Sequence, residues 1–197
     1  MQEFIQQIQS ELRESANVKQ SFSEELLRRI ARFAEMGGAA LKQDRKIIFF
    51  GNGGSAADAQ HLAAELVVRL QRNRRGLAAI SLATNASILT AAGNDFGFEN
   101  IFARQIESLV SEGDVLVALS TSGNSLNVLR GADAGRTRRA LVVGMTGQTG
   151  GELTGKVDLL INVPSRSAQR IQEAHITIGH IVCGLIEQIC CGDAPAA

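Results

Sequence analysis

The 197-residue sequence lacks an excess of charge of either sign, because 20 Lys and Arg residues balance 20 Asp and Glu residues. This balance gives no electrostatic reason to expect nucleic acid or an anionic membrane as the main partner, so any anion site must be local. No uninterrupted apolar run approaches the roughly 18 residues that span a bilayer. The segment Met1-Gln2-Glu3-Phe4 also lacks the layout of a signal peptide. We therefore expect a cytoplasmic protein without a membrane partner.

Cysteine is scarce as well. Cys183, Cys190 and Cys191 occur late in an apolar stretch and without the CxxC spacing of a metal site. An odd, clustered set in a cytosolic chain is most simply interpreted as free thiols in or near a core. Apolar residues make up 45% of the chain and charged residues 20%, which predicts a packed core within one sizeable domain.

From about residue 46 onward, short apolar segments alternate with segments of helical pattern. Near-continuous apolar strands separated by helices indicate a parallel sheet that is covered on both faces. We predict an α/β fold: a three-layer, doubly wound, parallel five-stranded sheet in a single domain at 1–192, followed by a loose tail at 193–197. The predicted strands are 46–50, 77–82, 114–119, 140–145 and 158–163, and the predicted helices are 54–71, 85–92, 98–111, 125–136 and 168–190.

Residues 1–42 form a predicted N-terminal extension of two amphipathic helices. Ser21, followed three residues later by Glu24, has the form of a capping box for the second helix. A helical pair ahead of an α/β domain must bury its apolar stripe on its own sheet or on a partner chain, and we favour the partner. The stripe of the first helix consists of Phe4, Ile5, Ile8 and Leu12, and that of the second of Phe22, Leu26, Leu27, Ile30, Phe33 and Ala34.

Two loops follow predicted strands at the edge where ligands bind in such sheets. The first is Gly51-Asn52-Gly53-Gly54-Ser55, and the second is Ser120-Thr121-Ser122-Gly123-Asn124-Ser125. Each opens a helix, and helix N-termini offer unpaired backbone N–H groups to a phosphate. A tight turn with a serine N-cap is the ordinary alternative for each loop taken alone. Neither matches a P-loop or a dinucleotide fingerprint, so a phosphorylated small molecule without a nucleotide is the better hypothesis.

Candidate reactive groups lie on the helices at 54–71 and 168–190. His61 and Glu65 are four positions apart and share one helix face. Gln172 and His180 are eight apart, which leaves them roughly 80° from a common line. A Glu base and a His acid can move protons at neutral pH, and the same groups can hold Zn²⁺. Each histidine can also be an ordinary helix residue, and we interpret His175 as structural.

Four strings in this order resemble the phosphoheptose isomerases of the sugar isomerase (SIS) fold. The resemblance covers nearly the whole chain and is weakest in the N-terminal helices. It is carried by the strings from Gly51 to His61, from Gly93 to Phe98, from Gly113 to Ser125, and from Arg170 to Glu173 together with His180.

The resemblance implies roles for individual residues. Glu65 and His180 match the acid/base pair, and one Zn²⁺ per subunit is expected on His61, Glu65, Gln172 and His180. It also implies a homotetramer with active sites at subunit interfaces, in which the N-terminal helices have a role in assembly. The expected substrate-binding residues are Asn52, Gly53, Gly54, Ser55, Glu65, Asn94, Asp95, Ser120, Thr121, Ser122, Ser125 and Gln172.

The implied reaction converts sedoheptulose 7-phosphate to D-glycero-D-manno-heptose 7-phosphate through an enediol, at the start of heptose synthesis for lipopolysaccharide and other cell-surface glycans. The alternative is a non-catalytic protein of the same fold that binds the replication initiator DnaA or senses a sugar phosphate. Glu65 and His180 are both present here, and this favours the enzyme.

Overall fold

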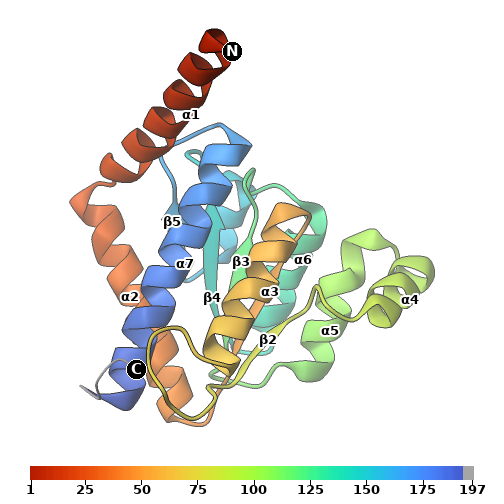
Figure 1. Cartoon of the computed structure of the whole chain (residues 1–197). Helices are drawn as coiled ribbons and strands as arrows, with labels where there is room; N and C mark the ends of the chain where they lie inside the picture. The colour runs from red at the N-terminus through yellow and green to blue at the C-terminus, as the bar shows by residue number, and fades with distance from the viewer. Residues whose placement is uncertain (193–197) are drawn as a thin grey trace.

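Five parallel strands form the centre of the computed structural model, which describes residues 1–192 (Figure 1). Their order is β2-β1-β3-β4-β5, and every neighbouring pair is parallel. The predicted fold class is therefore confirmed. The strands are β1 (Ile47–Gly51), β2 (Ala79–Ser81), β3 (Val115–Leu119), β4 (Leu141–Thr146) and β5 (Leu159–Asn162).

Helices cover both faces of this sheet. Successive strand residues point to opposite faces, so Ile47 and Phe49 enter one hydrophobic cluster while Ile48 and Phe50 enter the other. The first cluster is closed by α2 (Glu24–Lys42), α3 (Gly54–Val67) and α7 (Ala168–Cys191). The second is closed by α4 (Ala86–Phe96), α5 (Ile101–Leu109) and α6 (Leu126–Thr137), with the short 3₁₀ helices η1 (Phe98–Asn100) and η2 (Gly151–Lys156) beside them.

Of the two N-terminal helices, only the second buries its apolar stripe within the chain. The first, α1 (Gln2–Gln20), has no buried residue and extends away from the body of the domain (Figure 1). In contrast, α2 packs Leu26, Ile30 and Phe33 into the core of its own chain. The expectation that both stripes face a partner is therefore wrong for α2, whose stripe is wide enough to join the core beside α7.

The capping box predicted at Ser21 and Glu24 is wrong. Ser23 is the N-cap of α2, and its hydroxyl accepts a hydrogen bond from the Leu26 amide at 3.2 Å. The Ser21 hydroxyl instead donates to the Val18 carbonyl and helps to end α1. The turn between the two helices therefore contains two serines: Ser21 bonds to the end of α1, and Ser23 caps the start of α2.

The end of α3 also differs from prediction, since the helix stops at Val67 rather than at 71. The amides of Leu70, Gln71 and Arg72 donate to the Glu187 carboxylate, so they do not continue the helical ladder. This competing acceptor lies 115 or more residues away, which a local pattern cannot reveal. The other boundaries agree to within a few residues, and the predicted tail at 193–197 lies outside the described residues.

Helix α7 is, by length and composition alone, apolar enough to cross a membrane. Its buried side includes Ala174, Ile178 and Val182, which lie in the core between α2 and α3. We therefore interpret it as the core helix of the domain. The three cysteines are free, as predicted, and Cys183 is buried in that core.

Candidate active site

The two predicted loops meet where the order of the strands reverses. β1 lies between β2 and β3, so the chain winds in opposite directions from this point, and such crevices are the usual ligand sites of doubly wound sheets. Gly51 at the end of β1 lies beside Leu119 at the end of β3. A side chain at Gly51 would come within 2.7 Å of the Leu119 carbonyl oxygen, so the first loop needs glycine there to reach the second.

The glycine-rich turn leaves the start of α3 open. Gly53 is the N-cap residue with a φ of 54°, a conformation that favours glycine, and no side chain of the described residues caps the helix. Gly54 lies directly against the Gln172 side-chain amide. Asn52 points toward α6, where it pairs with Asn127. Ser55, in the first turn of α3, is buried.

The serine loop is folded on itself. The Ser120 hydroxyl donates to the Ser125 hydroxyl at 3.2 Å, and the Ser122 hydroxyl accepts from the Asn124 amide at 3.1 Å. Ser125 occupies the N-cap position of α6 without making a capping bond from its side chain. Ser125 is therefore the N-cap residue that the ordinary interpretation expects, but its side chain does not cap the helix. Thr121 and Ser122 line a pocket of about 230 Å³ with residues of the loops that follow β4 and β5.

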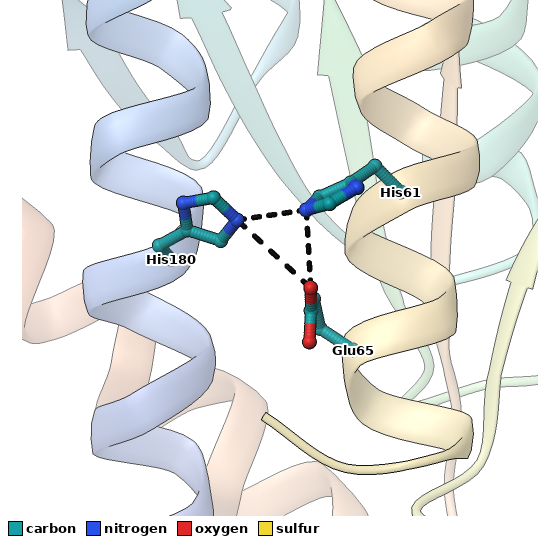
Figure 2. A group of neighbouring side chains, drawn as sticks. All are labelled: His61, Glu65 and His180. Carbon is teal, nitrogen blue, oxygen red and sulfur yellow. Dashed lines mark hydrogen bonds and ion pairs between the residues drawn. The ribbon is translucent and has the colours of Figure 1, made fainter. Parts of the chain in front are cut away.

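Three side chains converge between α3 and α7 (Figure 2). The His61 Nε2 atom lies 2.8 Å from the His180 Nε2 atom and 3.1 Å from a Glu65 carboxylate oxygen. The same oxygen lies 4.0 Å from His180 Nε2. The imidazole rings are nearly perpendicular, at 71°, so their ring nitrogens rather than their faces meet. The structure thus brings together three of the predicted site residues from segments more than a hundred positions apart.

The donor set of this group suits Zn²⁺. Two imidazoles and one carboxylate are common catalytic zinc ligands, which leave a fourth position for water or substrate. Tetrahedral bonds of about 2.0–2.1 Å to nitrogen would place the two nitrogens about 3.3 Å apart. The three ligand atoms in the structure lie within 4.8 Å of one another, so small side-chain movements suffice. His61, Glu65 and His180 therefore fit a metal.

Asp58 is a residue of this site that the sequence analysis missed. It lies one helical turn before His61 on α3, and one of its carboxylate oxygens is buried without a hydrogen-bond partner among the described residues. Burial raises the pKa of Asp58, and the nearby His61 and His180 partly offset this effect. Its spacing of three positions from His61 was the available signal.

Other predicted residues lie apart from the three-residue group. Among the described residues, no hydrogen bond joins Gln172 to the group, so its role as a fourth ligand stays a prediction. Asn94 and Asp95 are exposed near the end of α4, where the Asn94 amide donates to the Asp95 carboxylate at 2.8 Å. His175 is fully buried and bonds the Thr146 carbonyl oxygen, which agrees with a structural role.

The sequence and the fold are both similar to those of known proteins. A family model described as SIS domain matches residues 12–147. A phosphoheptose isomerase of Geobacter metallireducens is 52% identical over 183 residues, which are 93% of this chain and 97% of that protein. The solved phosphoheptose isomerase of Neisseria gonorrhoeae superimposes with a TM-score of 0.89 at 40% identity, covering 94% of this chain and 99% of that one. That of Francisella tularensis gives 0.90 at 33% identity, covering 93% and 98%.

Proposed function

The chain belongs to the phosphoheptose isomerases of the SIS-domain family, and we propose that it converts sedoheptulose 7-phosphate to D-glycero-D-manno-heptose 7-phosphate. The observation that supports this most is the meeting of Glu65 and His180, a carboxylate and an imidazole from separate helices, within 4.0 Å of each other. Aldose–ketose isomerisation needs such a pair of proton-transfer groups at one point.

The substrate phosphate is assigned to the serine loop. Ser120, Thr121, Ser122 and Ser125 offer hydroxyls, and the first turn of α6 offers backbone N–H groups with the positive end of the helix dipole. The glycine-rich turn, with Asn52, Gly53 and Gly54, then forms a wall for the sugar. The reacting end of the sugar would then lie at His61, Glu65 and His180, between α3 and α7.

Glu65 is assigned to proton transfer at carbon. As a carboxylate it takes a proton from C1 of the ketose, which gives an enediol, and the same proton or one from solvent is returned to C2. His180 protonates the oxygen on C2 and accepts the proton of the hydroxyl on C1, so the carbonyl moves from C2 to C1. A positioned acid or base typically contributes about 10²- to 10⁴-fold to the rate.

A Zn²⁺ ion would be held in this proposal by His61, Glu65 and His180, with Gln172 as a fourth ligand after a change in its side-chain position. It would supply Lewis-acid polarisation of a substrate oxygen, which would then be a fifth ligand. Coordination lowers the basicity of a carboxylate, so Glu65 can serve as base only if one of its oxygens stays free. The Nε2 atom of His180 faces the group and would bind the metal, so His180 would transfer protons through Nδ1. His61 then acts as a ligand without a proton-transfer role of its own.

Assembly and location complete the proposal. We assign the chain to a homotetramer in the cytoplasm, where it supplies heptose for lipopolysaccharide and other cell-surface glycans. The exposed stripe of α1 supports assembly, because Phe4, Ile8 and Leu12 are 65%, 58% and 67% exposed. Asn94 and Asp95 lie on α4, away from α7 (Figure 1), so they would contribute to the active site of a neighbouring subunit.

The experiment for the isomerase follows sedoheptulose 7-phosphate in D₂O by NMR. Aldose formation with deuterium at the carbon that receives the proton is expected for the wild-type protein, with loss of both in Glu65→Gln. The exposed Glu24→Gln in α2 is the matched control and should be fully active. Absence of exchange above background would favour the non-catalytic regulator or sugar-phosphate sensor instead.

Zinc is tested separately. Chelation should remove activity, and added Zn²⁺ should restore it. Zn²⁺ at 100 times its dissociation constant should also stabilise the wild-type fold by about 2.7 kcal/mol. The same addition should not stabilise His61→Gln to this extent. A metal-free protein of full activity contradicts the zinc assignment and leaves the isomerase proposal standing.

A further inference from the structure

A buried ion pair joins the loop after α3 to α7. The Arg74 guanidinium lies 2.8 Å from a carboxylate oxygen of Glu187, and the two side chains are only 3% and 0% exposed. A second nitrogen of Arg74 donates to the same oxygen at 3.0 Å. Neither residue belongs to the proposed reaction, and a charge pair buried so completely needs a reason, because desolvation of both ions is costly.

Arg74 also binds the end of α3. Its guanidinium donates to the carbonyl oxygens of Leu66 at 2.7 Å and of Glu65 at 2.9 Å. Both carbonyls belong to the last turn of the helix, where backbone acceptors have no partner within the helix and a cation is favoured. The side chain of Arg74 therefore holds the backbone of Glu65, the proposed base.

Glu187 holds the same loop from the α7 side. Its carboxylate accepts the backbone amides of Leu70 at 2.9 Å and Gln71 at 3.0 Å. Burial alone would raise the pKa of Glu187, but these bonds and the Arg74 guanidinium outweigh it and hold the pKa below its ordinary value. The carboxylate is therefore ionised at neutral pH and keeps all its bonds.

Helical geometry relates this pair to His180. Glu187 follows His180 by seven positions, so the two lie on nearly the same side of α7, about 10 Å apart along its axis. The Arg74–Glu187 pair thus connects the turn that carries Glu65 to the helix side that carries His180. Resting on the proposed function, we infer that Arg74 and Glu187 are positioning residues that fix Glu65 relative to His180.

The chain offers a second ion pair with one buried partner as a control. The Lys46 ammonium lies 2.7 Å from a carboxylate oxygen of Asp114, whose side chain is 1% exposed. These residues precede β1 and β3, at the opposite end of the strands from the glycine-rich and serine loops. A role in folding alone predicts the same behaviour for both pairs, whereas a positioning role predicts a difference.

The test replaces each pair and measures kcat, KM and Tm with sedoheptulose 7-phosphate. Glu187→Gln and Arg74→Lys should lower Tm and lower kcat by about 10- to 100-fold, the usual effect of removing a group that orients a ligand. Asp114→Asn should lower Tm and leave kcat of the folded enzyme unchanged. Equal losses of kcat in the Glu187 and Asp114 variants would overturn the inference, because instability alone would then explain both.

A double variant, Arg74→Met with Glu187→Leu, separates positioning from stability. Apolar replacement of both partners leaves no unpaired buried charge, so Tm should rise above that of Glu187→Gln, although the Leu70 and Gln71 amides still lose their acceptor. The reduced kcat should persist, with KM changed by less than about threefold. A wild-type kcat in the double variant would refute the inference. It would leave the isomerase proposal standing, because that proposal rests on the activity of the wild type. A crystal structure of the double variant provides a readout without substrate: a Glu65–His180 separation unchanged from 4.0 Å would also refute the inference.

Discussion

The side-chain amides of Asn52 and Asn127 form a reciprocal pair of hydrogen bonds, each 2.8 Å long. Asn52 belongs to the glycine-rich turn after β1, and Asn127 to the first turn of α6 after the serine loop. The two proposed walls of the substrate site are therefore joined directly, although they lie 75 positions apart. Asn127 is 2% exposed, so water cannot replace a lost partner easily.

Asn127→Ala should weaken both the fold and substrate binding. The half-buried Asn52 amide would lose its partner, which costs about 1 kcal/mol, the low end for a buried group. Because Asn52 would no longer be held toward the serine loop, KM should rise more than kcat falls. Urea unfolding and steady-state kinetics measure the two effects. Asn162→Ala, which removes only one long, exposed hydrogen bond, is the control. An unchanged KM in Asn127→Ala would show that the pair does not shape the substrate site.

Gly179→Ala should separate the helices that carry the proposed catalytic groups. A methyl group at Gly179 would overlap the Leu62 side chain, and these residues are the immediate neighbours of His180 and His61. Overpacking of this kind costs about 1–3 kcal/mol and moves backbones. We expect kcat to fall in Gly179→Ala and to recover when Leu62→Ala is added, since the smaller side chain makes room. A double variant as slow as the single one contradicts this explanation.

Acid should destabilise the protein through His175. Burial lowers the pKa of this histidine to about 4, although its bond to the Thr146 carbonyl works in the opposite direction. An unfolded histidine takes up its proton near pH 6.5, so the unfolded state binds more protons between pH 6.5 and 4. Stability from this group is complete above pH 6.5 and falls as the pH drops, by about 3 kcal/mol in all.

His175→Gln is the variant that isolates this effect. Chemical denaturation at a series of pH values should show a flatter decline between pH 6.5 and 4 than in the wild type, whatever its stability at pH 7. Parallel declines in the two proteins would assign the acid sensitivity to other groups. The outcome also bears on the interpretation of His175 as structural, because a neutral buried imidazole cannot act as an acid at neutral pH.

The sequence predicted the strands, the two loops and the group of His61, Glu65 and His180, because these follow from local apolar patterns and from motif resemblance. It did not predict that α3 ends at Val67. That boundary depends on Glu187, a charged residue whose spacing on α7 gives no sign of burial. Asn127 was missed for the same reason, since only the fold brings it to Asn52. The residues around such a side chain in the sequence give little indication of a partner that is distant along the chain.

The exposed stripe of α1 should determine assembly. Phe4→Ser, Ile8→Ser and Leu12→Ser together remove side chains that would each contribute about 1.5–3 kcal/mol on burial against a partner. Because none of them is packed in the chain itself, the helical content and the fold of the subunit should persist. Light scattering after gel filtration should show the wild type as a tetramer and the triple variant as smaller species.

The activity of the triple variant should fall as the tetramer is lost, since active sites at subunit interfaces are part of the proposal. Gln6→Ser with Glu14→Ser, on the opposite side of α1, should leave the tetramer intact. A triple variant that remains tetrameric and active would assign assembly to another surface.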